Sequence, residues 1–283
     1  METAISTCPT CGCQGVRWRC VEDCRLLRCP SCGLVFGTGA GVNVGRAFWS
    51  ADALQTTEEG LDHNFQGFSS ANAYRDYRQV FEGFFAERLA ALQRWGKVAS
   101  LLDVGAGPGF FVHYAAARLP EVLGLDLNGE NVRYAQQALH APVRLGDAES
   151  LRGTEFDRLW DAITCCEMLY YLDEPLAFLR QCRAMLPAGG LLYVQVPNNV
   201  DYHWACGVAE DFRWAHAQWH FSRRSLGAML RAASFQVVEV RTGVNGVVPE
   251  YQKGGPSPWR RAQWALARAL RVGGRLQVVA RGL

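Results

Sequence analysis

Residues 101–109, with the sequence LLDVGAGPG, carry the pattern that decides the fold. The apolar residues around Asp103 predict a buried strand, and glycines follow it directly at alternate positions. Glycine lets the backbone approach a ligand where a Cβ would collide, and residues 110–118 have the periodicity of a helix. The dinucleotide fingerprint needs its third glycine one residue later, where Phe110 stands. The segment therefore predicts a strand–turn–helix site for a nucleotide-like cofactor, with the pattern G-x-G-x-G.

Further apolar stretches follow this turn, and each ends in polar residues. Residues 122–125 end in Asp126, residues 143–145 run into Asp147, and a third stretch covers residues 161–167. A carboxylate at the end of a strand accepts hydrogen bonds from hydroxyl groups, so Asp126 is placed to bind both hydroxyls of a ribose.

With a helix, a Pro-x-Gly-Gly turn and a strand up to residue 198, these landmarks resemble the class I S-adenosylmethionine (SAM) dependent methyltransferases over residues 101–198. The resemblance implies an α/β fold, with a Rossmann-like sheet of seven strands and helices on both faces. It implies SAM (S-adenosyl-L-methionine) as the cofactor, with successive acids near its amino group, ribose and adenine. The cofactor-binding residues that it implies are Asp103, Gly105, Gly107, Gly109, Asp126, Asp147, Ala148, Glu167 and Tyr74.

Several of these residues also have an interpretation without a ligand. Asp126 and Asp147 could be helix caps, a position that Asp favours, and Asp103 could only brace the glycine turn. Tyr74 belongs to an aromatic stripe on a helix predicted within residues 71–95, which in the family often covers the cofactor. Such a stripe is also typical of a helix that packs on a core.

The N-terminal segment contains a doubled C-P-x-C-G motif, at residues 8–12 and 29–33. Paired C-x-x-C units at this separation predict a tetrahedral thiolate zinc site, and the zinc is structural because four thiolates leave no open position. The predicted ligands are Cys8, Cys11, Cys29 and Cys32. Cys13, Cys20 and Cys24 compete for the metal, and a disulfide framework or an iron–sulfur site are the alternatives.

The composition fits one catalytic domain with a small appendage: 283 residues, 49% of them hydrophobic and 20% charged. A net charge of +2 lacks the basic surplus of a protein that holds a long nucleic-acid duplex, so we do not expect a nucleic-acid partner. No apolar stretch is long enough to span a bilayer, so we expect no membrane partner. The absence of a hydrophobic segment before Cys8, and cysteines in apparent core segments, predict a cytoplasmic protein. The oligomeric state stays open.

The predicted domains are a zinc ribbon at 1–37, a linker and helical lid at 38–97, and a SAM-binding methyltransferase domain at 98–283. Within the last, residues 200–221 form an insertion rich in aromatic and imidazole side chains. Because open α/β sheets bind ligands at the carboxyl ends of their strands, we expect this insertion to form the acceptor pocket. A helix that begins after Ser222 and an antiparallel last strand over residues 274–280 complete the predicted fold.

Two histidines in the insertion are the candidates for catalysis. A sulfonium methyl is already activated, so the enzyme mainly aligns the acceptor and excludes water. For a hydroxyl acceptor, a base would accelerate the reaction by roughly 100- to 10,000-fold, and His220 and His216 are the predicted catalytic residues. Residues 219–222 resemble an H-x-F-S element of small-molecule methyltransferases, although a lone histidine can also be structural.

A divalent cation in the catalytic domain is not expected. Quinone O-methyltransferases of this superfamily carry a Glu-x-x-Glu-His motif that is associated with such a cation, and here residues 167–171 keep only the first acid, Glu167. One carboxylate is a poor site for a hard dication.

These features predict a SAM-dependent methyltransferase that acts on a small-molecule acceptor, through a hydroxyl of a sugar or secondary metabolite. The alternatives are an RNA or protein methyltransferase that uses the zinc ribbon for recognition, an N- or C-methyltransferase of a natural product, and a scaffold without activity. The sequence does not identify the acceptor.

Overall fold

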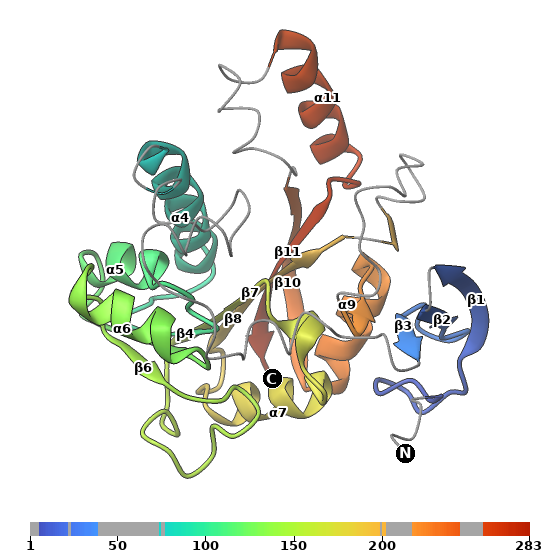
Figure 1. Cartoon of the computed structure of the whole chain (residues 1–283), viewed down its shortest axis with the longest axis horizontal. Helices are drawn as coiled ribbons and strands as arrows, with labels where there is room; N and C mark the ends of the chain where they lie inside the picture. Colours follow the sequence, from blue (N-terminus) through green and yellow to red (C-terminus); the bar gives the residue numbers. More distant parts are fainter. Residues whose placement is uncertain are drawn as a thin grey trace.

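The computed structural model describes residues 6–21, 24–38, 74, 77–198, 200–201, 217–243 and 257–283. Within them the chain forms a large central sheet with helices on its two faces, and a smaller sheet beside it (Figure 1).

The larger sheet has seven strands in the order β10-β11-β8-β7-β4-β5-β6. The strands are β4 (Ser100–Val104), β5 (Glu121–Asp126), β6 (Val143–Leu145), β7 (Ala162–Cys166), β8 (Leu191–Pro197), β10 (Phe235–Gly243) and β11 (Arg275–Gly282). The strands from β8 to β6 are parallel, whereas β11 is antiparallel to both of its neighbours. The predicted seven-stranded sheet and its antiparallel last strand are confirmed. The strand order reverses at β4 and β7, and open α/β sheets bind ligands at such a switch point.

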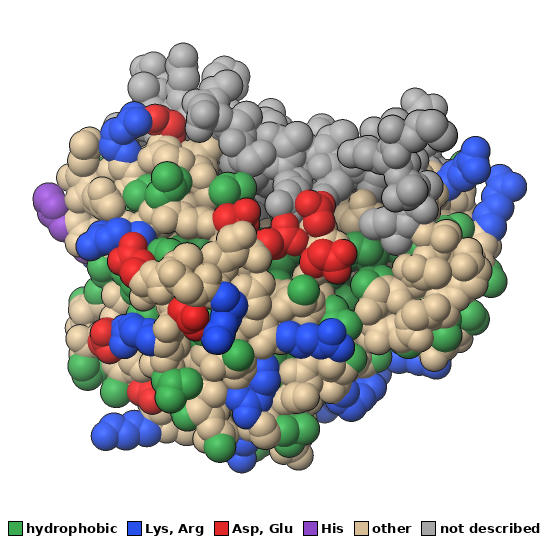
Figure 2. Space-filling view, turned by 90° about the horizontal axis from the view of Figure 1, so that it is seen from below, with side chains coloured by type: hydrophobic (Ala, Val, Ile, Leu, Met, Phe, Trp, Pro, Cys, Tyr) green, Lys and Arg blue, Asp and Glu red, His purple; other side chains and the backbone are tan. Residues whose placement is uncertain are grey.

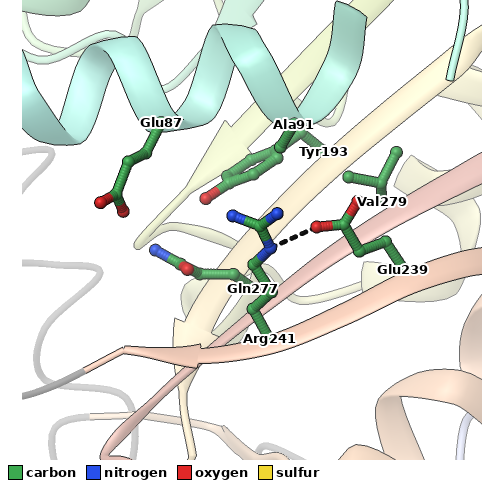
Figure 3. A pocket seen from close by; sticks show the side chains of 7 residues that line it. All are labelled: Glu87, Ala91, Tyr193, Glu239, Arg241, Gln277 and Val279. Atoms are coloured by element: carbon green, nitrogen blue, oxygen red, sulfur yellow. Dashed lines mark ion pairs between the residues drawn. The ribbon is translucent and has the colours of Figure 1, made fainter. Parts of the chain in front are cut away.

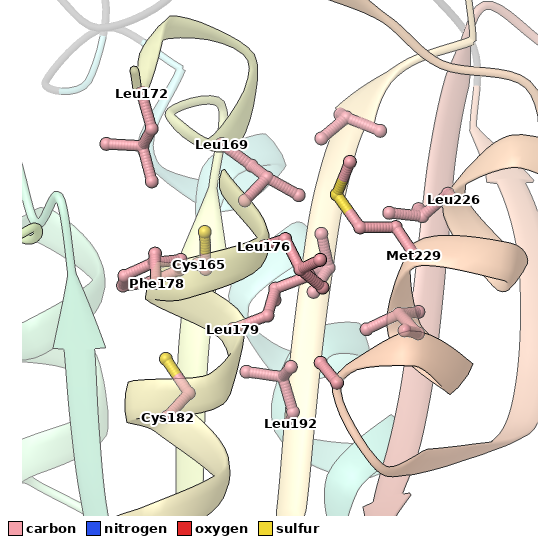
Figure 4. Close-up of a cluster of buried hydrophobic side chains, with 14 of the residues drawn as sticks. Cys165, Leu169, Leu172, Leu176, Phe178, Leu179, Cys182, Leu192, Leu226 and Met229 are labelled. Atoms are coloured by element: carbon pink, nitrogen blue, oxygen red, sulfur yellow. The ribbon is translucent and has the colours of Figure 1, made fainter. Parts of the chain in front are cut away.

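Helices cover both faces of this sheet, as predicted (Figure 1). The helices are α4 (Arg78–Gln93), α5 (Phe110–Ala116), α6 (Gly129–Gln137), α7 (Pro175–Ala184) and α9 (Arg223–Ala232). Because side chains alternate along a strand, Leu101 and Leu191 pack with α4, α5 and α6, while Leu102 and Leu192 face the opposite core. Figure 4 shows this second core, where α7 and α9 enclose Leu192 with Leu179 and Met229.

The smaller sheet has the order β1-β2-β3-β9, and its last strand is unexpected. Its strands are β1 (Val16–Val21), β2 (Cys24–Arg28), β3 (Val35–Thr38) and β9 (Trp219–His220). β1 to β3 form the predicted ribbon, but β9 belongs to the segment that we expected to form the acceptor pocket. The structure pairs β9 antiparallel with β3, and residues 202–216 of the predicted acceptor insertion lie outside the described residues. The ribbon is therefore joined to the methyltransferase domain by a shared sheet.

The predicted lid helix is α4, and it packs on the central sheet. Phe81, Phe85, Leu89 and Leu92 on this helix are buried, so α4 is a layer of the fold. The rest of the predicted linker, residues 39–73, lies outside the described residues. Before the last strand, α11 (Pro258–Ala269) projects from the body in Figure 1.

None of the helices in the described part of the chain combines the length and apolar character that crossing a membrane requires.

Candidate active site and metal centre

The glycine turn between β4 and α5 uses its three glycines in different ways. Gly105, Gly107 and Gly109 have φ values of 74°, 53° and 82°, in the left-handed region that favours glycine. A Cβ at Gly109 would lie 2.7 Å from the Cβ of Ala135, and one at Gly105 would lie 2.9 Å from the Cγ of Met168. Among the described residues, a Cβ at Gly107 would meet no atom within 4 Å. Gly105 and Gly109 are thus required by packing, and Gly107 leaves open space for a ligand.

Asp126, the last residue of β5, lies directly beside this turn. Its Oδ2 accepts a 2.7 Å hydrogen bond from the backbone N–H of Gly107. Its Oδ1 accepts hydrogen bonds from the N–H of Asn128 at 3.0 Å and from Nδ2 of Asn131 at 3.1 Å. Burial raises the pKa of Asp126, although these donors lower it. The helix cap of α6 is Asn128, not Asp126, and the carboxylate keeps lone pairs for further donors such as ribose hydroxyls.

Asp103 lies at the centre of the site, on β4. Its Oδ1 accepts a hydrogen bond from the hydroxyl of Thr164 on the neighbouring β7. Burial raises the pKa of Asp103 to about 6, although Arg88 and Thr164 lower it. The groups that act on this carboxyl come from β7 and α4, and its contact with the cofactor stays a prediction.

Arg88 on α4 is a site residue that the sequence analysis missed. Its guanidinium stacks over Phe111 at 4.1 Å, and its Nε is buried with no hydrogen-bond partner among the described residues. Burial lowers the pKa of Arg88, but the negative partners Cys166 and Asp103 outweigh this and raise it overall. The signal was present in the sequence, because Arg88 follows Phe81 by seven residues and so falls on the apolar stripe of the helix.

A second polar cluster lies at the carboxyl end of β7, around Glu167. This residue has a φ of 58°, and its carboxylate accepts hydrogen bonds from Nε2 of Gln195 at 3.0 Å and from the hydroxyl of Tyr170 at 3.2 Å. It also forms an ion pair with Arg275, the first residue of β11. About 30% of the Glu167 side chain and 21% of the Arg275 side chain remain exposed. Arg275 and Gln195 come from distant strands, and no local pattern pointed to them.

A small pocket continues from this cluster, between α4 and strands β8, β10 and β11 (Figure 3). The residues that line it are Glu87, Ala91, Tyr193, Glu239, Arg241, Gln277 and Val279. Gln277 donates a 3.0 Å hydrogen bond to Gln195, which in turn donates to Glu167. The pocket and the Glu167 cluster are therefore linked by hydrogen bonds.

The remaining predicted cofactor residues have these positions. Asp147 follows β6, and its Oδ1 accepts a hydrogen bond from the N–H of Glu149 at 2.9 Å, while Ala148 is buried. Tyr74 is also buried, and its ring stacks on Phe110 with centroids 4.1 Å apart. Tyr74 thus packs against aromatic side chains of α4 and α5. Cofactor contact by Tyr74, Asp147 and Ala148 stays a prediction.

Of the two predicted catalytic histidines, the structure describes His220. His220 lies in β9, opposite Val35 of the ribbon, and none of its surface is exposed. A side chain with no exposed surface offers no contact to an acceptor in this structure, so a catalytic role for His220 stays a prediction that its burial does not favour. His216 lies outside the described residues.

The four predicted metal ligands do meet. The sulfur atoms of Cys8, Cys11, Cys29 and Cys32 all lie within 4.8 Å of one another. The Cys8–Cys32 and Cys11–Cys29 sulfur pairs are 3.5 and 3.4 Å apart, close to the roughly 3.8 Å edge of a tetrahedron with Zn–S bonds of about 2.3 Å. Cys13 lies outside this cluster, with its thiol 3.9 Å from the carbonyl of Cys11.

Solved structures share the fold. A chain from the complex between the Haloferax volcanii Trm112 methyltransferase activator and a methyltransferase aligns with a TM-score of 0.52 and 21% identity, over 75% of this chain and 94% of that one. A SAM-dependent methyltransferase from Clostridium acetobutylicum aligns with a TM-score of 0.51 and 11% identity, over 75% and 97% of the two chains. Together with the strand order and the glycine turn, this defines the class I methyltransferase fold.

A family model for the methyltransferase domain matches residues 74–240, and the chain belongs to this family of SAM-dependent methyltransferases. A ubiquinone biosynthesis O-methyltransferase from Xanthomonas campestris is 31% identical over 175 residues, which cover 57% of this chain and 68% of the relative. One from Aliivibrio fischeri is 31% identical over 103 residues, 35% of this chain and 44% of that protein. The activity predicted from the sequence, methyl transfer from SAM, is confirmed.

Proposed function

We propose that this enzyme transfers the methyl group of SAM to a hydroxyl oxygen of a small-molecule acceptor. The observation that carries the proposal is the Glu167 cluster, a partly exposed carboxylate at the acceptor end of the sheet, held by Tyr170, Gln195 and Arg275. The similarity to O-methyltransferases of small molecules supports it.

The cofactor would lie across the carboxyl ends of β4 and β5. Asp126 would accept the ribose hydroxyls, and the open space at Gly107 would admit the amino acid part of the cofactor. Asp103 would bind its ammonium group, while Arg88 would bind its carboxylate, because an unsatisfied buried guanidinium donor and a carboxylate of opposite charge suit the two ends of an amino acid. The cofactor supplies a sulfonium methyl that needs no further activation.

The role of proton acceptor passes from His220 to Glu167 in this proposal. A hydroxyl that approaches Glu167 would donate a hydrogen bond to its carboxylate, which raises the nucleophilicity of the oxygen. Arg275, Gln195 and Tyr170 keep the carboxylate in one orientation, so the acceptor oxygen is aligned with the methyl group. On the sheet side, the buried side chains of Phe85 and Phe111 limit the access of water.

Recognition of RNA or protein by the ribbon is the second candidate. The ribbon uses one edge, β3, to pair with β9 within the chain, which supports an internal role. In the space-filling view, acidic side chains are interspersed with basic ones over the part of the face away from the ribbon (Figure 2), which differs from the strongly basic surfaces that bind nucleic acid.

We also propose that the cysteine cluster binds one structural zinc ion. Gly12 and Gly33, which follow the two cysteine pairs, have φ values of 67° and 79°, as tight turns around a metal require. Their N–H groups donate to the carbonyls of Cys8 and Cys29. Four converging sulfur atoms fit the preference of zinc for tetrahedral thiolate coordination.

Methyl-labelled SAM tests the acceptor class. The enzyme is incubated separately with small hydroxyl compounds, with RNA and with protein extract, and we expect label in the first pool. Glu167→Gln should lower kcat by about 100-fold or more, with the SAM affinity kept within about threefold. Glu174→Gln, at an exposed carboxylate nearby, is the control and should keep full activity. Label only in RNA or protein, or an unchanged rate for Glu167→Gln, would contradict the proposal.

A further inference from the structure

We infer that the cysteine cluster of the ribbon positions the acceptor end of the catalytic sheet, through β3 and β9, so that metal release loosens the acceptor site and leaves the cofactor site formed. The inference rests on the proposed function for the identity of the acceptor site. It concerns a chain of contacts that crosses from the ribbon into the methyltransferase domain.

The first link joins the metal ligands to β3. Cys29 donates its N–H to the carbonyl of Leu34 at 2.8 Å, and the N–H of Cys32 points to the sulfur of Cys29 at 3.4 Å. β3 begins one residue after Leu34. Leu34 and Phe36 are fully buried and belong to the same core cluster as Cys29 and Cys32. The position of β3 therefore depends on the second C-P-x-C-G turn, residues 29–33, whose two cysteines would bind the metal.

The second link joins β3 to β9. Phe36 stands opposite Trp219, with ring centroids 6.0 Å apart. Gly37 and Gln218 exchange two hydrogen bonds, from the N–H of Gly37 to the carbonyl of Gln218 at 3.0 Å and from Nε2 of Gln218 to the carbonyl of Gly37 at 2.7 Å. A strand of two residues cannot hold its position without a partner, so β9 is ordered by β3.

The third link joins β9 to the short 3-10 helix η1 (Leu169–Tyr171). The N–H of Gln218 donates to the carbonyl of Tyr170 at 3.1 Å, and the indole Nε1 of Trp219 donates to the carbonyl of Leu172 at 2.6 Å. Tyr170 in turn donates its hydroxyl to Glu167. The segment that follows the acceptor-site carboxylate is thus fastened through Tyr170 and Leu172 to Gln218 and Trp219.

A fourth contact reaches the second C-P-x-C-G turn from the methyltransferase domain. The guanidinium of Arg224, on α9, donates a 2.6 Å hydrogen bond to the carbonyl of Ser31, between Cys29 and Cys32. The cofactor residues Gly107 and Asp126 lie on the other side of β4, and their hydrogen bonds stay within β4, β5 and α6. Loss of the metal should therefore act on the acceptor end first.

Hydrogen exchange of the full chain, with zinc bound and after removal by a chelator under reducing conditions, tests the inference without any acceptor. We expect exchange in residues 168–172 and 217–222 to become about tenfold faster without zinc, because their partners are lost, while residues 121–126 stay unchanged. The SAM affinity should change by less than about threefold. Unchanged exchange in residues 168–172, with faster exchange in the ribbon, would overturn the inference.

A matched pair of variants covers the case in which the zinc-free chain unfolds completely. In the zinc-bound protein, Arg224→Ala should raise exchange in residues 168–172 and 217–222 by about three- to tenfold, as expected for loss of one charged hydrogen bond. Arg223→Ala removes the same charge from the neighbouring exposed residue, whose backbone N–H makes its contact with Asp201, and should have no effect. Equal exchange in the two variants would overturn the inference. A failure to methylate small hydroxyl compounds would contradict only the proposed function.

Discussion

The backbone N–H of Gly107 donates a 2.7 Å hydrogen bond to the carboxylate of Asp126, and this bond joins the glycine turn after β4 to the end of β5. The two most informative acid and glycine positions in the sequence are thus direct neighbours. The ribose acid and the turn that admits the cofactor are held in one unit, so a change in either should affect binding of SAM.

Substitutions of Gly109 and Gly107 should have different effects, the first on the stability of the fold and the second on the binding of SAM. Gly109→Ala places a Cβ 2.7 Å from Ala135 at a φ of 82°, and we expect it to lower the free energy of unfolding by about 2–4 kcal/mol. The Cβ of Gly107→Ala would meet no atom in the described part of the chain, so the change should cost only about 1 kcal/mol but abolish SAM binding. Urea unfolding and calorimetry measure the two effects, and SAM binding by a folded Gly107→Ala variant would contradict the site.

Asp126→Ala should weaken SAM binding by about 1.5–3 kcal/mol, or roughly 10- to 150-fold, because it removes a charged hydrogen-bond acceptor. Calorimetry with SAM measures the loss. Asp157→Ala, at a carboxylate near the surface that pairs with Arg152, is the control. Unchanged affinity in Asp126→Ala would show that the ribose binds elsewhere.

The affinity for SAM should depend on pH through Asp103. The pKa of Asp103 is about 6 in the folded chain, above its ordinary value near 4. The folded chain thus favours the protonated carboxyl. The stabilisation that this gives is fully present below about pH 4 and is lost as the pH rises through 6. Binding of an ammonium group needs the ionised form, so SAM affinity should fall about tenfold for each pH unit below 6.

Asp103→Asn tests whether this pH dependence comes from Asp103 or from Asp126, because burial also raises the pKa of Asp126. Calorimetric titrations between pH 5 and 8 should show a weaker and flatter profile for the variant, since one titrating group is gone. A variant profile as steep as that of the parent would assign the effect to another group.

Arg88→Met should reduce the affinity for SAM by about 10- to 100-fold, because the carboxylate of SAM loses its guanidinium partner. Methylthioadenosine has the same nucleoside and no amino acid part, so its affinity should stay within about twofold. Equal losses for both ligands would show that Arg88 acts on the fold and not on the carboxylate.

The protein should contain one zinc ion per chain after purification under reducing conditions. The double variant Cys29→Ser, Cys32→Ser should lose it, because tetrahedral thiolate coordination needs all four ligands. Cys13→Ser should keep the metal, since Cys13 lies outside the cluster. Elemental analysis by mass spectrometry measures the stoichiometry, and a parent protein without zinc would contradict the assignment.

The sequence by itself determined the parts that depend on local chemistry. The run from Leu101 to Gly109 specified its own strand, turn and helix, because alternate glycines and a buried apolar run allow few other conformations. The doubled cysteine motif likewise identified Cys8, Cys11, Cys29 and Cys32, because spacing within a knuckle is a local property. Asp126 could be placed at the glycine turn because the carboxyl ends of neighbouring parallel strands meet at one edge.

Only the tertiary structure decided which distant residues meet. Arg275 reaches Glu167 because β11 is inserted beside β8, and Arg88 comes near enough to lower the pKa of Asp103 because α4 packs on the sheet. His220 was expected at the acceptor, but it completes the ribbon sheet. A strand of two residues, such as β9, is too short to be predicted from its own sequence. Its pairing depends on a strand edge that another part of the chain supplies. Contacts between distant segments depend on packing of the whole core, which no local pattern records.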